Sequence, residues 1–165
     1  MAILPRAHSS DILLATTGVI YFISDACVSS QLEVAISGEG STDGGLGRIR
    51  QLAHAGNIFF WTVLIDGVYK IRFHAEADPA IHTRFGAGNV DITEQRLELP
   101  TGRVQLRSAV GRVVDVADLA PGSYRVTLAW SSDEESKHFD LASASEYPDA
   151  DGPDGVIILN RIAEA

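Results

Sequence analysis

Apolar and polar residues alternate with a period of two along much of this chain, and the alternation is clearest at 123–131. One face of that segment carries Tyr124, Val126, Leu128 and Trp130, and the other carries Ser123, Arg125, Thr127 and Ala129. Successive side chains of a β-strand point to opposite sides of the sheet. The pattern therefore predicts a strand with one buried face.

Turn-forming residues separate this strand from its neighbours. Pro100-Thr101-Gly102, Gly111 and Pro121-Gly122 each precede a segment that alternates in the same way. Glycine and proline favour the backbone angles of turns, so each of these sites marks the start of a new strand. The strands predicted on this basis are 12–15, 19–24, 31–37, 57–65, 68–76, 90–99, 103–107, 112–116, 123–131 and 156–162.

Two of the connections between predicted strands are short enough for hairpins. Asp66-Gly67 tolerates the positive φ of a type I′ turn and predicts a hairpin between 57–65 and 68–76. Thr17-Gly18 predicts a hairpin or a bulge between the first two strands. In the strand 68–76 we expect the buried face to hold Tyr69, Ile71, Phe73 and Ala75.

The predicted elements are about ten short strands with no convincing helix and no repeat, which is typical of an all-β protein. Alternating strands need a second sheet on which to bury their apolar faces. The fold class we expect is a two-sheet antiparallel β-sandwich or jelly roll with little helix. At 165 residues the chain fits one such domain spanning 1–165.

Two segments fall outside the strand pattern. Five of the ten residues of 38–47 are glycine, and we expect a flexible hairpin or crossover loop there. No lysine follows at the spacing of a phosphate-binding loop, although a loop that grips a ligand stays an alternative. The segment 131–155 is polar and predicts a long surface excursion, with at most one short helical turn at 136–146.

The formal net charge of −9 bears on the class of partner. Nucleic-acid binding draws on a Lys and Arg surface, and the 13 basic residues are scattered, so we expect no nucleic-acid partner. An acidic surface can steer encounters with a basic protein, although acidity also simply keeps a protein in solution. The candidate binding residues lie in the polar excursion: Asp133, Glu134, Glu135, Asp149, Asp151 and Asp154.

Candidates for catalysis or metal binding are few. His74 and Glu76 share a strand face and His82 follows in the next loop, so the three could meet a metal ion in a small ligand-binding jelly-roll enzyme. The Asp-rich segment 149–155 fails the EF-hand pattern, with Pro153 at position 5 and Asn160 at position 12, and we expect a turn there, with a calcium site of another kind as the alternative. No serine is presented as a nucleophile elbow. We therefore expect no catalytic residues, no bound metal and no cofactor.

The single cysteine, Cys27, excludes a disulfide within the chain and is typical of a reducing compartment. We expect it to be a small buried residue next to a strand end, with a reactive thiol as the alternative. The N-terminal residues lack the apolar core of a cleaved signal peptide, so we expect a cytoplasmic protein without a membrane span. Secretion by a system that cleaves no signal stays open.

Three segments resemble a group of small, uncharacterised bacterial β-sandwich proteins found near polymorphic toxins. These segments are DGVYKIRFHAEADP (66–79), ITEQRLELPTGRVQL (92–106) and APGSYRVTLAW (120–130). More distantly, the chain resembles the competence nuclease-inhibitor family. The resemblance implies the sandwich fold and a role as a binding or inhibitory partner. The positions that match are structural: Gly67, Pro100, Gly102, Pro121, Gly122 and Tyr124.

The sequence thus favours a non-enzymatic protein-binding module, in the form of an immunity or inhibitor protein that acts on a basic toxin or nuclease. The alternative is the small ligand- or metal-binding enzyme that would use His74, Glu76 and His82. A third hypothesis is a β-domain that self-associates into a homodimer through its edge strands.

Overall fold

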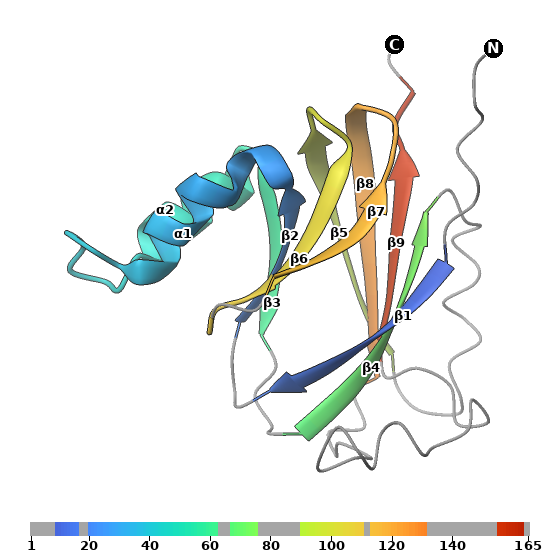
Figure 1. Cartoon of the computed structure of the whole chain (residues 1–165), viewed down its shortest axis with the longest axis horizontal. Helices are drawn as coiled ribbons and strands as arrows, with labels where there is room; N and C mark the ends of the chain where they lie inside the picture. The colour runs from blue at the N-terminus through green and yellow to red at the C-terminus, as the bar shows by residue number, and fades with distance from the viewer. Residues whose placement is uncertain are drawn as a thin grey trace.

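The computed structural model describes residues 9–16, 20–62, 67–75, 90–110, 113–131 and 155–163. In these ranges the chain forms two β-sheets and a pair of helices (Figure 1). The strands are β1 (Ser9–Thr16), β2 (Ile20–Asp25), β3 (Ile58–Thr62), β4 (Gly67–Ala75), β5 (Val90–Leu99), β6 (Arg103–Ser108), β7 (Val113–Asp118), β8 (Gly122–Ser131) and β9 (Gly155–Arg161). A 3-10 turn, η1 (Ala26–Val28), leads into α1 (Ser29–Ser37), and α2 (Leu46–His54) follows.

The two sheets pack face to face, as the alternating pattern predicts. One sheet has five strands in the order β1-β4-β9-β8-β5, and the other has four in the order β3-β2-β6-β7. We call them the five-stranded and the four-stranded sheet. The sides of the two sheets that face each other share one apolar core. The five-stranded sheet contributes Tyr124, Val126 and Leu128 of β8 and Ile71, Phe73 and Ala75 of β4. The four-stranded sheet contributes Tyr21, Trp61 and Leu106. The two-sheet, all-β prediction is confirmed.

Strand pairing differs from the prediction in three places. β1 pairs with β4, whereas β2 pairs with β3 and β6, so the first two strands belong to different sheets and form no hairpin. β3 and β4 also lie in different sheets, so the hairpin predicted at Asp66-Gly67 is wrong. The pair β4–β9 is parallel, although every other pair in the described sheets is antiparallel. In the first two cases the chain crosses from one sheet to the other, whereas β4 and β9 are neighbours within the five-stranded sheet.

The strand predicted at 31–37 is a helix, α1, and this prediction is wrong. Leu32 and Ala35 are buried, whereas Val34 is 53% exposed, so the buried positions follow the helical spacing and not a period of two. A second helix, α2, begins at Leu46, within the last two residues of the glycine-rich segment, where the sequence pattern predicts none. Ile49, Leu52 and Ala53 of α2 have the same helical spacing and face the same apolar cluster.

Candidate functional site: a helical arm with a groove

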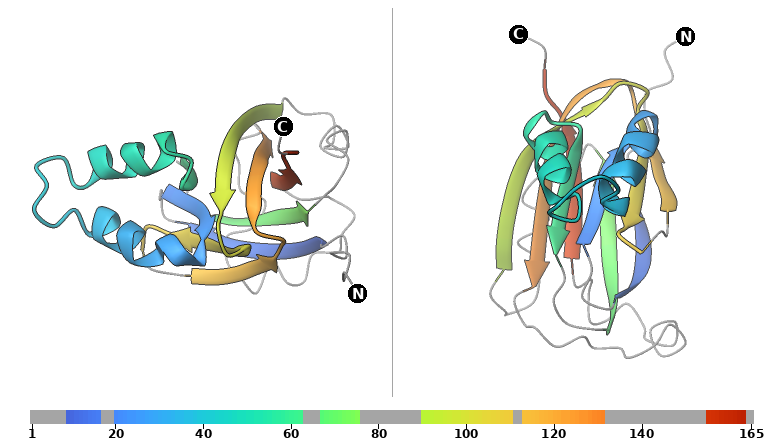
Figure 2. Two further views of the ribbon diagram at one scale, coloured as in Figure 1. Left: turned by 90° about the horizontal axis from the view of Figure 1, so that it is seen from above. Right: turned by 90° about the vertical axis from the view of Figure 1, so that its left-hand side faces the viewer.

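The two helices form a projection on the outer side of the four-stranded sheet, which we call the helical arm (residues 29–54). In Figure 1 and in the left view of Figure 2 the arm extends away from both sheets, with the connection between its helices at the far end. Its base is apolar, because Leu32, Ala35 and Ile49 pack against Phe22 and Ile58 of the sheet. The rest of the arm lies beyond the sandwich, where a partner can reach it.

A buried arginine fixes helix α1 to the sheet. Arg107 of β6 points outward from the sheet, and its side chain is only 7% exposed. Its Nη1 donates to Oε1 of Glu33 at 3.1 Å, and its Nη2 donates to the hydroxyl of Ser29. Both acceptors lie on α1, so a guanidinium group in β6 sets the angle at which the arm leaves the sheet.

An amide side chain fixes the other helix. Nε2 of Gln95, on β5, donates to the carbonyl oxygens of Ala53 and Ile58 at 2.9 and 3.0 Å. These two carbonyls flank the turn from α2 into β3. The base of the arm is thus held by one polar side chain from each sheet.

The glycine-rich segment forms the compact tip of the arm. Asp43 accepts hydrogen bonds from the backbone nitrogens of Gly45 and Gly47 at 3.1 and 2.8 Å, and from the hydroxyl of Ser41. These bonds satisfy amide groups at the start of α2 that have no partner within the helix. The Ser41 hydroxyl first, and the Gly47 amide next, hold the pKa of Asp43 below its ordinary value. The prediction of a loop between strands is wrong here, because this segment joins two helices.

Glycine at the tip is required by a close contact between the helix ends. Gly45 has φ +87°, and a Cβ there would lie 1.8 Å from the carbonyl oxygen of Ala35. Gly38 has φ +64° and would place a Cβ 2.7 Å from the backbone of Gly44. A side chain at either position would force the two helices apart.

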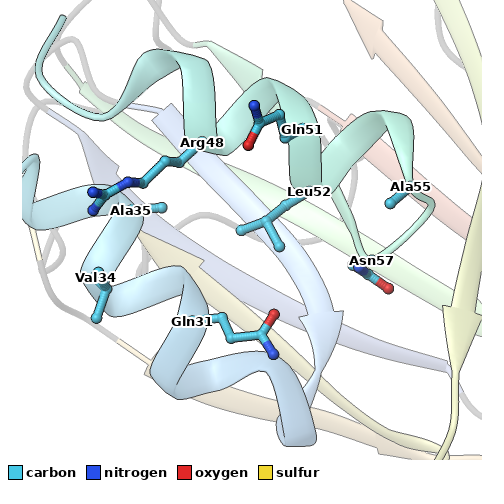
Figure 3. A pocket seen from close by; sticks show the side chains of 8 residues that line it. All are labelled: Gln31, Val34, Ala35, Arg48, Gln51, Leu52, Ala55 and Asn57. Atoms are coloured by element: carbon cyan, nitrogen blue, oxygen red, sulfur yellow. The ribbon is translucent and has the colours of Figure 1, made fainter. Parts of the chain in front are cut away.

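An open groove of about 560 Å³ runs between α1 and α2 (Figure 3). Val34, Ala35 and Leu52 form its apolar part. Three amide side chains, those of Gln31, Gln51 and Asn57, surround this part, and Arg48 lies toward the tip. A groove with an apolar floor and a few polar groups is typical of a binding site.

The candidate binding residues from the sequence, Asp133, Glu134, Glu135, Asp149, Asp151 and Asp154, lie outside the described ranges. Of the metal candidates, His74 lies on β4, opposite Ser9 of β1 and Ile158 of β9. Glu76 and His82 are outside the described residues, so that hypothesis stays a prediction. In the part of the chain that the structure describes, no group of three His, Cys, Asp or Glu side chains is placed to hold a metal ion.

Cys27 lies in η1 and is exposed, so the expectation of a buried thiol is wrong. The chain turns at this point, and the next residue, Val28, is the one that faces the interior. Desolvation, together with the neighbouring Asp25 carboxylate, raises the pKa of the Cys27 thiol. The thiolate is therefore disfavoured, which argues against the reactive-thiol alternative.

Known proteins share this architecture, and one of them is related in sequence as well. No protein-family model matches the chain, and no curated protein matches it. Among solved structures, a protein described as "Crocagin biosynthetic gene J" is 30% identical, with a TM-score of 0.70, over 95% of this chain and 99% of its own. The chain belongs to the family of this crocagin biosynthesis protein.

A second solved structure shares only the fold. ComJ of Bacillus subtilis, an inhibitor of the DNA-degrading activity of NucA, is 9% identical, with a TM-score of 0.55, over 97% of this chain and 100% of its own. The resemblance to a nuclease inhibitor that the sequence suggested is thus present as a distant similarity of fold. No helix within the described ranges has the length and apolar character needed to span a bilayer.

The helical arm is the part of the site that sequence reasoning missed. The signal was present, because Leu32, Ala35 and Ile36 have the spacing of one helix face and Ile49, Leu52 and Ala53 repeat it. In the first helix the alternation of Leu32, Val34 and Ile36 fits a strand equally well. In the second, the apolar face spans only about a turn and a half, which is short for a reliable pattern.

Proposed function

We propose that the protein is a non-enzymatic protein-binding module that acts on an enzyme, with the helical arm as its contact surface. The observation that carries the proposal is the arm itself: a projection with an open groove, one wall of which includes the half-exposed Val34. An open groove with apolar side chains and a few polar groups is typical of a binding site, and Val34 is one of its lining residues. The arm's polar anchors, Arg107 and Gln95, position this surface and leave it accessible.

The first form of the proposal is an inhibitor or immunity protein whose target is a basic nuclease or toxin. The shared fold with an inhibitor of a nuclease supports it. Charge supports it as well, because the chain has 22 Asp and Glu residues against 13 Lys and Arg residues, a formal net charge of −9. The acidic residues include the six candidate binding residues of the polar segment 131–155, and we propose that these six steer a basic partner toward the arm.

The test takes its target enzyme from the genes next to this chain's own, using any DNA-degrading enzyme that they encode. Purified full-length chain is added to that enzyme in a DNA-degradation assay and in a direct binding assay. We expect stoichiometric loss of nuclease activity, and we expect Val34→Asp to weaken binding by about tenfold or more, because it places a charge in the apolar contact. Val110→Asp, at an exposed valine outside the arm, is the matched control and should bind as wild type. Equal weakening by both variants, or no binding at all, would reject the proposal.

The second form is a binding protein that serves a biosynthetic enzyme, and the family relationship favours it. The 30% identical relative, which matches over nearly its whole length, is described as a crocagin biosynthetic gene. Deleting this chain's gene in its host, followed by mass spectrometry of the metabolites, tests this form. Loss of one peptide-like or small product, restored by wild type and not by Val34→Asp, would support it. An unchanged metabolite profile would reject it.

A further inference from the structure

The groove of the helical arm has a polar lining that needs a particular kind of ligand. Gln31, Gln51 and Asn57 line it, and their side-chain amides make no hydrogen bond within the described part of the chain. Each amide offers two donors and an acceptor. A purely apolar ligand would leave all of these groups without partners as it displaced water from them.

The groove has the length of a short extended peptide. Arg48, Gln51, Leu52 and Ala55 of the α2 segment line one side, and a helical rise of about 1.5 Å per residue makes that side roughly 10 Å long. Three residues of an extended chain span about the same length. A peptide backbone presents N–H and C=O groups in alternation. The carbonyl oxygen of an amide side chain can accept from the N–H groups, and its NH2 group can donate to the C=O groups.

Arg48 supplies the only ionised group of the described lining. Its Nη1 donates to the carbonyl oxygen of Glu39 at 3.1 Å, and it forms no ion pair with any described carboxylate. By contrast, Arg96, Arg103 and Arg107 each pair with a carboxylate. A guanidinium group has five donors, and the bond to Glu39 uses one of them, so Arg48 has donors left for a ligand at the tip end of the groove.

We propose that this groove binds an extended segment of the partner protein that carries an aliphatic side chain and, next to it, an acidic side chain. The aliphatic side chain packs between Val34 and Leu52, the peptide backbone bonds to the amides, and the carboxylate pairs with Arg48. Nucleic acid fits less well, because one cation cannot neutralise a run of phosphates. The proposal rests on the proposed function in one respect, namely that the arm is the surface that meets the partner.

A random heptapeptide library displayed on phage tests the inference with the full-length chain as bait. The selection is run in parallel on wild type and on Val34→Asp, and we expect wild type alone to enrich sequences with an aliphatic residue beside Glu or Asp. The enriched peptide is then synthesised with neutral, blocked ends, both as selected and with its acidic residue changed to the amide. We expect the amide form to bind about tenfold more weakly, because it loses a charge-assisted hydrogen bond.

Variants at Arg48 make the assignment specific. Arg48→Gln should remove the difference between the acidic and the amide peptide, whereas Arg50→Gln, on the same helix and outside the groove lining, should preserve it. Nuclear magnetic resonance of the bound chain should show shifts in the side-chain amides of Gln31, Gln51 and Asn57. Enrichment of basic peptides, equal binding of both peptide forms, no enrichment over Val34→Asp, or selection of nucleic acid in a parallel aptamer experiment would overturn the inference.

The two proposals fail in different ways. If Val34→Asp weakens binding to the enzyme but no acidic peptide is selected, the arm is supported as the contact surface and the proposal of an acidic segment is rejected. Selection of acidic peptides without any effect on an enzyme or a metabolite would reject the proposed function and keep the peptide groove.

Discussion

Asp25 and Thr101 are 76 positions apart in the sequence, and the carboxylate of the first binds both the hydroxyl and the backbone nitrogen of the second. Oδ1 of Asp25 accepts from the Thr101 hydroxyl at 2.6 Å, and Oδ2 accepts from the Thr101 nitrogen at 2.9 Å. The same carboxylate accepts from the nitrogens of Gly102 and Cys27 at 3.0 and 2.9 Å. Asp25 is fully buried, so one charged group at the end of β2 joins the turn before β6 to the turn before the arm.

This contact predicts how stability depends on pH. Burial alone would raise the pKa of Asp25, but the hydrogen bonds from Cys27 and Thr101 outweigh it and hold the pKa below the ordinary value. Because the folded-state pKa is the lower one, the carboxylate stabilises the fold above the unfolded pKa of about 3.9. That stabilisation is lost as the pH falls through the folded-state value.

We expect Asp25→Asn to lower the free energy of unfolding at pH 7 by about 1–3 kcal/mol, because an amide cannot accept all four bonds. In urea unfolding the difference from wild type should shrink as the pH falls below about 3.9, because Asp25 of the unfolded chain then takes up a proton that the folded chain resists. Thr101→Val removes only the hydroxyl bond to Asp25, so it should lower the free energy of unfolding by about 1 kcal/mol. An Asp25→Asn effect that is the same size at pH 7 and pH 3 would contradict the charged role of this residue.

The tip of the arm allows a matched comparison of two glycines. Gly44 and Gly45 both have positive φ, but a Cβ at Gly44 meets nothing within 4 Å, whereas one at Gly45 would collide with the Ala35 carbonyl. Gly44→Ala should therefore cost only the backbone strain, about 1 kcal/mol. Gly45→Ala should cost more and should lower hydrogen-exchange protection in both helices. Equal effects of the two substitutions would show that the helix ends are not in contact.

The ion pair that fixes α1 to the sheet joins a buried charge, Arg107, to an exposed one, Glu33, so the two charges can be tested separately. Glu33 is 65% exposed, so Glu33→Gln should change stability by less than about 1 kcal/mol, as surface ion pairs do. Arg107→Ala should cost about 1–3 kcal/mol, because it leaves a void between sheet and helix and removes the donor to Ser29. Hydrogen exchange should show faster opening of α1 in Arg107→Ala, with β8 unchanged. If β8 also exchanged faster, Arg107 would stabilise the whole fold and not the arm in particular.

Salt dependence tests the electrostatic part of the proposed function. If the acidic excursion steers a basic enzyme, the association rate should fall as salt rises, because exposed charges are screened. Changing Asp133, Glu134 and Glu135 together to lysine should slow association by about tenfold, with a smaller effect on dissociation. Stopped-flow or surface plasmon resonance measures both rates. If neither salt nor the three charge reversals changed the association rate, electrostatic steering would be rejected, and only an apolar contact through the arm would stay as the proposal.

The local pattern of the sequence determined most of the strands. β5 begins and ends where the sequence predicts, and β6, β7, β8 and β9 do so within two residues. Tyr124, Val126 and Leu128 of β8 are buried as expected, but Thr127 and Ala129 on the opposite face are buried as well, so the expectation of a single buried face is wrong there. These predictions succeed because alternation and turn residues are properties of neighbouring positions in the sequence. The strands concerned also turn one side toward the core between the two sheets, which is the arrangement that alternation indicates.

Tertiary structure decided the arm and the pairing of strands. The segment from Leu32 to Ile36 can alternate as a strand or align as a helix, and the apolar patch of Phe22 and Ile58 on the outer side of the sheet selects the helix, whose face covers it. None of the groove could be assigned from the sequence, because Gln31 and Arg48 come together only when the two helices pack. Likewise, Asp66-Gly67 permits a hairpin but does not require one, and the parallel pairing of β4 with β9 joins segments whose proximity no local pattern encodes.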